Sequence, residues 1–175
     1  YLSAREGLVF DQTNTFTNMY GGLYFQDSSH TLIRDLILNT NGTAITLSST
    51  GTYSSFGLNM TLTNITANNA RIGLQYDYHY TNVNISGNSF VNASLDGINF
   101  VDDTYYNSNP TNVTIEHNNF SRAGSYAAII SNCNGYMIFK NNDYSNSTNG
   151  IQIASSLDNT CSNFTFDNAD LSGNG

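Results

Sequence analysis

Aspartate and histidine side chains gather in two stretches of the chain, where they could do chemistry. Asp77 and His79 stand in one stretch, and Asp102 and Asp103 stand in the other. Two carboxylates at a defined separation can hydrolyse a glycosidic bond, and several hard oxygen ligands can bind calcium. All four residues are therefore candidates for catalysis on a polysaccharide, and the three aspartates are candidates for a calcium site. Aspartate is also common in turns, so a purely conformational role is the third interpretation.

The elements that would position these residues follow from a repeat of roughly 25 residues. If Val83 opens a unit, apolar residues follow at Ile85, Phe90, Ile98 and Phe100. Comparable sets recur before and after this unit: Val9, Phe16, Leu23 and Phe25; Ile33, Leu38, Ile45 and Leu47; Leu58, Met60, Ile65, Ile72 and Leu74; Val113, Ile115, Phe120, Ala128 and Ile130; Met137, Phe139, Tyr144, Ile151 and Ile153; Phe164, Phe166 and Leu171. Apolar and polar residues alternate within the segments, which predicts strands, and helical spacing is not sustained.

Asparagine, glycine, aspartate and serine separate the apolar segments, and these residues suit turns with left-handed backbone. Asn88, Asn118 and Asn142 fall at one equivalent turn position, where stacked asparagines can form an amide ladder. One unit cannot bury its apolar residues alone, but stacked units can. The sequence therefore predicts a single all-β domain over residues 1–175. We expect a right-handed parallel β-helix of about seven coils, each with three short strands. The alternative is an antiparallel sandwich, whose hairpin turns would not preserve a fixed three-strand unit.

The same unit carries a resemblance to a known class of proteins. Its pattern V-x-I-x-x-N-x-F, followed by G-I-x-F, resembles the coil repeat of right-handed parallel β-helices over nearly the whole chain. That class includes pectate-lyase-like enzymes and many archaeal and bacterial surface proteins. The resemblance implies the fold, whereas function varies widely among proteins that share this scaffold.

Stacking of the units also assigns a register to the aspartates. Asp77 and Asp103 are expected at the same position of successive units, with Cα atoms about 5 Å apart. Two such carboxylates repel, so one keeps its proton or a cation bridges them. The resemblance implies a basic residue or a Gly-His-Gly motif beside the aspartates of an enzyme, and this series of loops contains neither. A polysaccharide lyase or glycoside hydrolase is therefore the less favoured interpretation. No cofactor is required, although the aspartates could bind calcium.

Cys133 and Cys161 are the two cysteines of the chain. Each precedes the first strand of its unit, and the units are neighbours, so stacking would bring the two thiols within disulfide range. A disulfide favours an oxidising, extracellular setting. Two reduced, buried thiols are the alternative.

Asn-x-Ser/Thr sequons are numerous and make the chain a candidate surface glycoprotein. Their asparagines are Asn41, Asn59, Asn64, Asn84, Asn92, Asn112, Asn119, Asn146 and Asn163. A chain so rich in asparagine, serine and threonine contains many sequons by composition alone. We therefore expect a few sites to be occupied rather than all of them.

Charge and hydropathy restrict the partners. The net charge is −8 with five basic residues, which argues against nucleic acid, because phosphate neutralisation needs clustered lysine and arginine. No apolar run approaches the roughly 20 residues of a membrane span.

The ends of the chain contain no convincing cap for a β-helix, so either the chain is part of a longer solenoid or other copies cover its ends. The favoured expectation is an extracellular structural protein at the cell surface or envelope, which self-assembles into a sheath, S-layer or fibre. The alternative is a polysaccharide-active enzyme or carbohydrate-binding module that uses Asp77, Asp102 and Asp103.

Overall fold

The computed structural model describes residues 2–3, 7–10, 14–48, 57–77, 80–101, 112–131, 134–154 and 162–175. All regular elements in these ranges are β-strands, so the described part of the chain is all-β and contains no helix. Each inter-strand pairing is parallel. This result confirms the all-β class and excludes the antiparallel sandwich for these residues.

The strands form two sheets. The seven-stranded sheet consists of β1 (Leu2–Ser3), β4 (Leu23–Gln26), β6 (Thr43–Ser48), β8 (Ile72–Asp77), β10 (Ile98–Val101), β12 (Tyr126–Ser131) and β14 (Asn149–Ala154), in that order. The eight-stranded sheet consists of β2 (Val9–Phe10), β3 (Asn14–Met19), β5 (Leu32–Thr40), β7 (Gly57–Thr66), β9 (Tyr80–Ser86), β11 (Val113–Glu116), β13 (Asn134–Lys140) and β15 (Ser162–Asp167).

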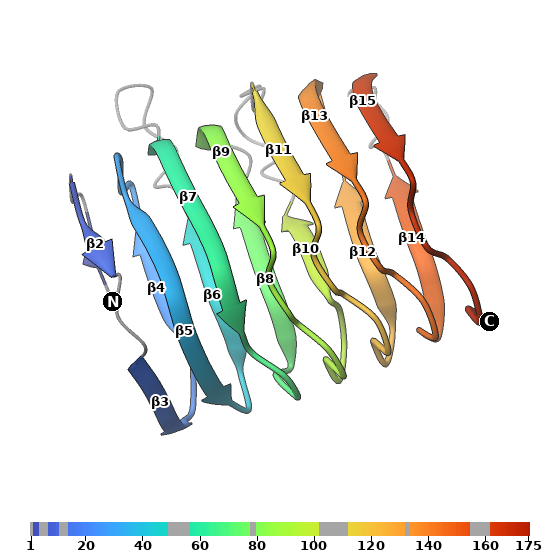
Figure 1. Cartoon of the computed structure of the whole chain (residues 1–175), viewed down its shortest axis with the longest axis horizontal. Helices are drawn as coiled ribbons and strands as arrows, with labels where there is room; N and C mark the ends of the chain where they lie inside the picture. The colour runs from blue at the N-terminus through green and yellow to red at the C-terminus, as the bar shows by residue number, and fades with distance from the viewer. Residues whose placement is uncertain are drawn as a thin grey trace.

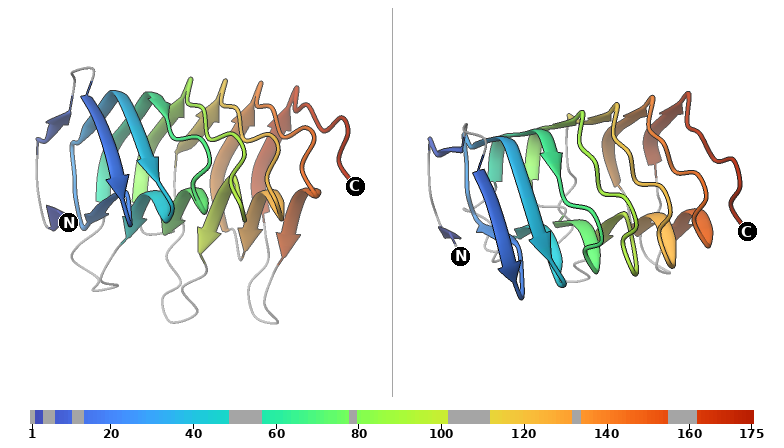
Figure 2. Two further views of the ribbon diagram at one scale, coloured as in Figure 1. Left: turned by 90° about the horizontal axis from the view of Figure 1, so that it is seen from below. Right: turned by 60° about the horizontal axis from the view of Figure 1, so that its bottom comes forward.

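From β4 onward the chain alternates between the two sheets. Strand β8, for example, pairs with β6 and β10, whereas β7 and β9 lie in the other sheet. Figures 1 and 2 show the two layers of strands, with the N-terminus at one end of the stack and the C-terminus at the other. This arrangement is compatible with the parallel β-helix expected from the repeat.

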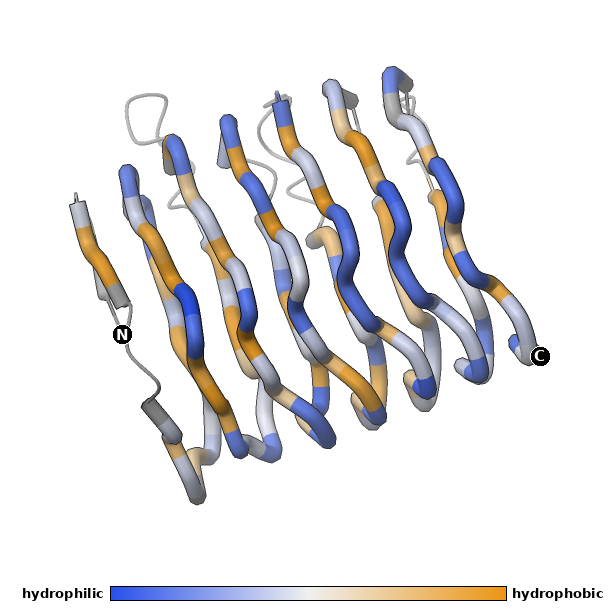
Figure 3. The backbone as a smooth tube through the Cα atoms, viewed as in Figure 1, coloured by the Kyte–Doolittle hydropathy of each residue, from blue (hydrophilic) through white to orange (hydrophobic). Residues whose placement is uncertain are grey.

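A column is defined here as the set of residues at the same register in successive units. Val83, Val113 and Met137 form one buried column, and Ile85 and Ile115 belong to the next. Apolar residues recur at similar levels of neighbouring strands in Figure 3. The alternation predicted for these units is therefore confirmed.

Aromatic rings form a further buried column between the sheets. The ring centroids of Phe90 and Phe120 are 5.8 Å apart, and those of Phe120 and Tyr144 are 5.7 Å apart. The planes are nearly parallel, at 8° and 16°. Ring stacking with this offset adds to the stabilisation by burial of apolar area.

The predicted register of one early unit was wrong by two residues. The sequence placed Leu58 at the position of Val83, but the sheet pairs Met60 with Val83. Likewise, Ile98 pairs with Leu74, whereas the sequence had placed Ile72 there. A slip of two residues keeps every side chain on the same face of a strand, so the apolar alternation could not detect it.

One column of asparagines in the eight-stranded sheet has a shared backbone conformation. Asn59, Asn82 and Asn112 occupy one column and have φ angles of 56°, 53° and 59°. Asparagine adopts this left-handed conformation more readily than most residues because its short side chain can bond locally. Left-handed positions of this kind therefore explain part of the abundance of asparagine.

Candidate functional site

The carboxylate pair predicted from the sequence does not have the expected register. Asp77 is the last residue of β8 and pairs with Val101 of β10. The offset between these strands is 24 residues rather than the 26 that would align Asp77 with Asp103. The shared register of these two aspartates is therefore corrected. Asp102, Asp103 and His79 themselves lie outside the described residues, so their catalytic role stays a prediction.

The calcium prediction also depends on Asp102 and Asp103. Among the residues that the structure describes, no group of three or more histidine, cysteine, aspartate or glutamate side chains could hold a metal ion. Cys133 and Cys161 lie outside the described ranges as well, and their disulfide stays a prediction.

The amide ladder is the polar feature that the structure builds most completely. Asn88 Nδ2 donates to Asn118 Oδ1 at 2.9 Å, and Asn118 Nδ2 donates to Asn142 Oδ1 at 3.0 Å. All three side chains are buried. The backbone N–H groups of Asn88 and Asn118 also donate to the next Oδ1, at 3.0 and 2.9 Å. Buried amides at these positions are therefore well paired, as stability requires.

The ladder has apolar neighbours at both ends. Its column continues to Ile65 on one side and to Ala169 on the other. At the Ile65 end the terminal amide oxygen of the ladder is paired, because the backbone N–H of Ile65 donates to Asn88 Oδ1 at 2.9 Å. Ala169 has no side-chain acceptor to offer Asn142.

A buried hydroxyl lies beside the end of the ladder. Tyr144 takes the position that Phe90 and Phe120 occupy in preceding units, and its Oη has no hydrogen-bond partner among the described residues. Burial raises the pKa of this phenol well above its usual range, and the Asn142 side chain offsets only part of that increase. The hydroxyl is therefore a local cost to stability.

The structure brings together one aspartate pair that the sequence analysis missed. Asp143 and Asp170 form a parallel bridge in neighbouring units. Oδ1 of each accepts a bond from the backbone N–H two residues later, at 2.9 Å in both cases. Hydrogen bonds from the backbone and the side chain of Ser172 lower the pKa of Asp170 below its usual value. The signal in the sequence is the recurring Asp-x-Ser, which begins at Asp143 and again at Asp170.

Asn119 occupies the same column and makes the same turn. Its Oδ1 accepts from the backbone N–H and the hydroxyl of Ser121, at 2.9 and 2.6 Å. The sequon at Asn119 is therefore explained by turn chemistry, since aspartate replaces this asparagine in the next two units.

Six other sequon asparagines have a positive φ, within strands or in the connections between them, and asparagine has a conformational role at such positions. They are Asn59, Asn64, Asn92, Asn112, Asn146 and Asn163. Asn41 and Asn84 have neither that conformation nor the serine turn. Their side chains are exposed, and the backbone does not explain the choice of asparagine there.

At the C-terminal end of the stack, apolar residues of the core columns are exposed. Ile153 is 45% exposed, although Ile130 before it in the column is fully buried. Leu171 is 48% exposed and follows the fully buried Tyr144. Strands β14 and β15 each pair on one side only within the described residues. We call this surface the C-terminal edge.

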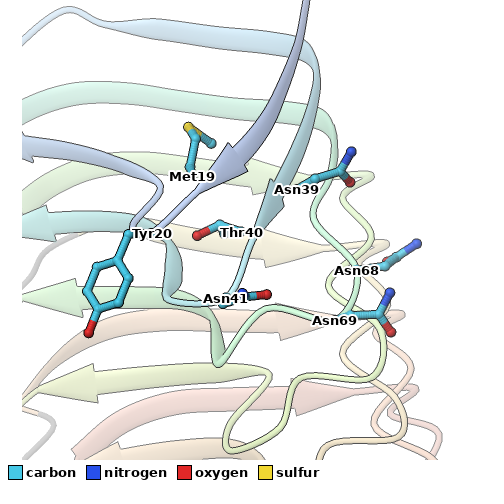
Figure 4. A pocket seen from close by; sticks show the side chains of 7 residues that line it. All are labelled: Met19, Tyr20, Asn39, Thr40, Asn41, Asn68 and Asn69. Carbon is cyan, nitrogen blue, oxygen red and sulfur yellow. The ribbon is translucent and has the colours of Figure 1, made fainter.

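A pocket of about 430 Å³ lies where β3 and β5 end. It is lined by Met19, Tyr20, Asn39, Thr40, Asn41, Asn68 and Asn69. Tyr20 is 96% exposed, and Figure 4 shows Asn41 between this ring and the neighbouring Asn69. Sequence analysis did not predict this pocket, because its residues come from three different units.

Comparison of the sequence with protein-family models and with curated proteins finds no match. The described residues contain no helix that is long and apolar enough to cross a membrane.

Proposed function

We propose that this chain is an extracellular structural protein of a cell surface or envelope, built as a right-handed parallel β-helix of about seven coils. Copies stack end to end into a fibre, sheath or S-layer. The right hand is the expected one, because crossovers between parallel strands of a sheet are nearly always right-handed. The extracellular location rests on the predicted disulfide and sequons.

Exposure at the C-terminal edge is the observation that carries this proposal. Ile153 and Leu171 belong by register to the core but are about half exposed. Strands β14 and β15 each pair with one neighbouring strand only within the described residues, and the edge of a sheet readily accepts a further strand. Another parallel strand on each sheet would cover the apolar side chains of Ile153 and Leu171.

A second copy of the chain is the occupant that we propose for this edge. Two columns run from one end of the stack to the other, one from Leu2 to Ile153 and one from Phe10 to Phe166. A copy whose Leu2 follows Ile153 and whose Phe10 follows Phe166 continues both columns with apolar residues. Such a contact is heterologous and does not close on itself, so it produces a polymer.

Sedimentation velocity on matched variants tests this proposal. Ile153→Asp places a charge at the C-terminal edge, and Ile138→Asp places the same charge on a lateral face. Ile138 is 46% exposed, so the two substitutions remove an isoleucine of nearly equal exposure. We expect wild type and Ile138→Asp to form large assemblies and Ile153→Asp to stay small. Loss of assembly in Ile138→Asp alone, or a wild-type protein that stays monomeric, would overturn end-to-end stacking.

The polysaccharide-active alternative gains no support from the described residues. Asp77 pairs in register with Val101 of the adjacent strand, and the other predicted catalytic residues are outside the described ranges. We therefore put forward the structural role alone and propose no cofactor for it.

A further inference from the structure

We propose that Asn41 carries an N-linked glycan whose first sugar packs against Tyr20 in the pocket between the first three units. The extracellular location of the proposed function is a premise of this inference, since N-glycosylation takes place on chains that enter a secretory route. End-to-end assembly is not a premise.

The position of Asn41 separates it from the other sequons. Seven of the nine asparagines either hold a positive φ or make a serine turn, and the fold explains them without a glycan. Asn84 lies within β9, where it belongs to the outer face of the eight-stranded sheet. Asn41 instead belongs to the short connection between β5 and β6, and exposed connections are the usual place for a modification.

The side chain of Asn41 is exposed and no hydrogen bond to it occurs among the described residues. Comparable sequons differ in this respect. Asn64 Nδ2 donates to Asp35 Oδ1 at 2.6 Å, and Asn112 Nδ2 donates to Asn82 Oδ1 at 3.0 Å. Modification of Asn64 or Asn112 would therefore remove a contact between units, whereas modification of Asn41 removes none.

Backbone packing holds Tyr20 next to Asn41. The N–H of Asn41 donates to the carbonyl of Met19 at 3.4 Å. A Cβ on Gly42 would lie 2.4 Å from the carbonyl oxygen of Tyr20, so the sequon Asn41-Gly42-Thr43 passes directly over the preceding unit. Tyr20 is 96% exposed, which is far more than is usual for an aromatic residue of a folded protein.

The chemistry of the pocket suits a sugar. Its lining includes the amides of Asn39, Asn68 and Asn69, and also Tyr20, whose ring stands to one side of these amides in Figure 4. Neutral amides can bond sugar hydroxyls, and a tyrosine ring can cover the apolar face of a pyranose. No charged residue lines the pocket, which fits a neutral N-acetylhexosamine better than an acidic ligand.

The transfer step needs a donor, and a lipid-linked diphosphate oligosaccharide supplies it. Asn41 Nδ2 forms the bond to the anomeric carbon, the bond from that carbon to the diphosphate oxygen breaks, and Nδ2 loses one proton. The lipid diphosphate leaves with the electron pair. An oligosaccharyltransferase of the producing cell catalyses the exchange, and no oxidant or reductant is consumed.

Site-resolved mass spectrometry of protein secreted from a glycosylating host tests the attachment. We expect the chymotryptic peptide that contains Asn41 to carry a glycan in wild type and to lose it in both Asn41→Gln and Thr43→Val. The control Asn64→Gln should leave the glycan on Asn41 unchanged. An unmodified Asn41 in secreted wild-type protein would overturn the inference.

Release of the glycan from the folded protein tests the packing on Tyr20. Peptide N-glycosidase should remove the Asn41 glycan more slowly from wild type than from Tyr20→Ala, while Tyr136→Ala, which removes another exposed ring, should match wild type. Equal release rates in all three proteins would refute the contact. Sedimentation of unglycosylated protein reports on assembly independently, so failure of the proposed function and failure of this inference are distinguishable.

Discussion

The side chain of Asn118 donates a hydrogen bond of 3.0 Å to Oδ1 of Asn142, and both side chains are only 2% exposed. Asn118 also accepts from Asn88 and donates to the carbonyl of Ile85 at 2.9 Å. Loss of the amide would break all of these bonds, although Asn88 Nδ2 would keep its bond to the carbonyl of Leu62 and Asn142 Oδ1 would keep its bond from the backbone N–H of Asn118. The ladder therefore links three successive units through polar contacts as well as apolar ones.

Replacement of the central amide should be costly. We expect Asn118→Ala to lower the free energy of unfolding by about 3 kcal/mol, because it removes four hydrogen bonds between buried groups. Urea unfolding measures the change. The exposed Asn84→Ala should lie within about 0.5 kcal/mol of wild type, and an equal loss in both variants would contradict the ladder's role.

Removal of the unpaired Tyr144 hydroxyl should instead raise the free energy of unfolding. Tyr144→Phe restores the residue type of Phe90 and Phe120, so we expect a gain of about 1 kcal/mol in the free energy of unfolding. Loss of stability in urea unfolding would show that the hydroxyl has a partner.

The same phenol predicts a dependence on pH. Its pKa is higher in the folded protein than in the unfolded chain, where a tyrosine titrates near pH 10. Folding is then favoured below pH 10 and loses this contribution as the pH rises through the folded pKa. The difference in stability between wild type and Tyr144→Phe should change above pH 10. A constant difference across that range would refute the shift.

Gly97 allows close contact between neighbouring units. A Cβ at this position would lie 2.6 Å from the carbonyl oxygen of Ala127 and 2.8 Å from Cβ of Phe120. We expect Gly97→Ala to cost about 2 kcal/mol through overpacking. Gly21→Ala is the control, since its Cβ would meet no atom within 4 Å. Thermal unfolding of both variants checks the prediction, and similar midpoints would contradict it.

The bridge between Asp143 and Asp170 should be sensitive to salt. Two like charges at one register repel, so Asp143→Asn should raise stability at low ionic strength and lose that advantage as salt screens the pair. The variant keeps the oxygen that bonds the Ser145 N–H, as Asn119 does for Ser121. It also creates a sequon, so the protein must come from a host without N-glycosylation. A benefit that is independent of salt would exclude repulsion as its cause.

The sequence predicted the parts of the fold that depend on local spacing. Apolar alternation gave the strands, and the spacing of Asn88, Asn118 and Asn142 gave the amide ladder that the structure confirms. Register between units was harder, because the offset varies from 24 residues between β8 and β10 to 30 between β10 and β12, and a slip of two residues leaves the apolar alternation unchanged. The alignment of Asp77 with Asp103 was wrong for that reason.

The candidate surfaces depended on register and could not be predicted from one unit at a time. Tyr20 and Asn41 line one pocket only after their units stack, and Asp143 pairs with Asp170 in the same way. Exposure of Ile153 likewise follows from its place at the edge, since its residue type is that of a core position.

Electron cryomicroscopy of the unglycosylated wild-type protein at high concentration is the most direct test of end-to-end assembly. The account predicts polymers in which strands spaced by about 4.8 Å continue across each junction, with Leu2 of one copy following Ile153 of another. Isolated single copies, or polymers joined through the outer faces of the sheets with Ile153 still exposed, would contradict it.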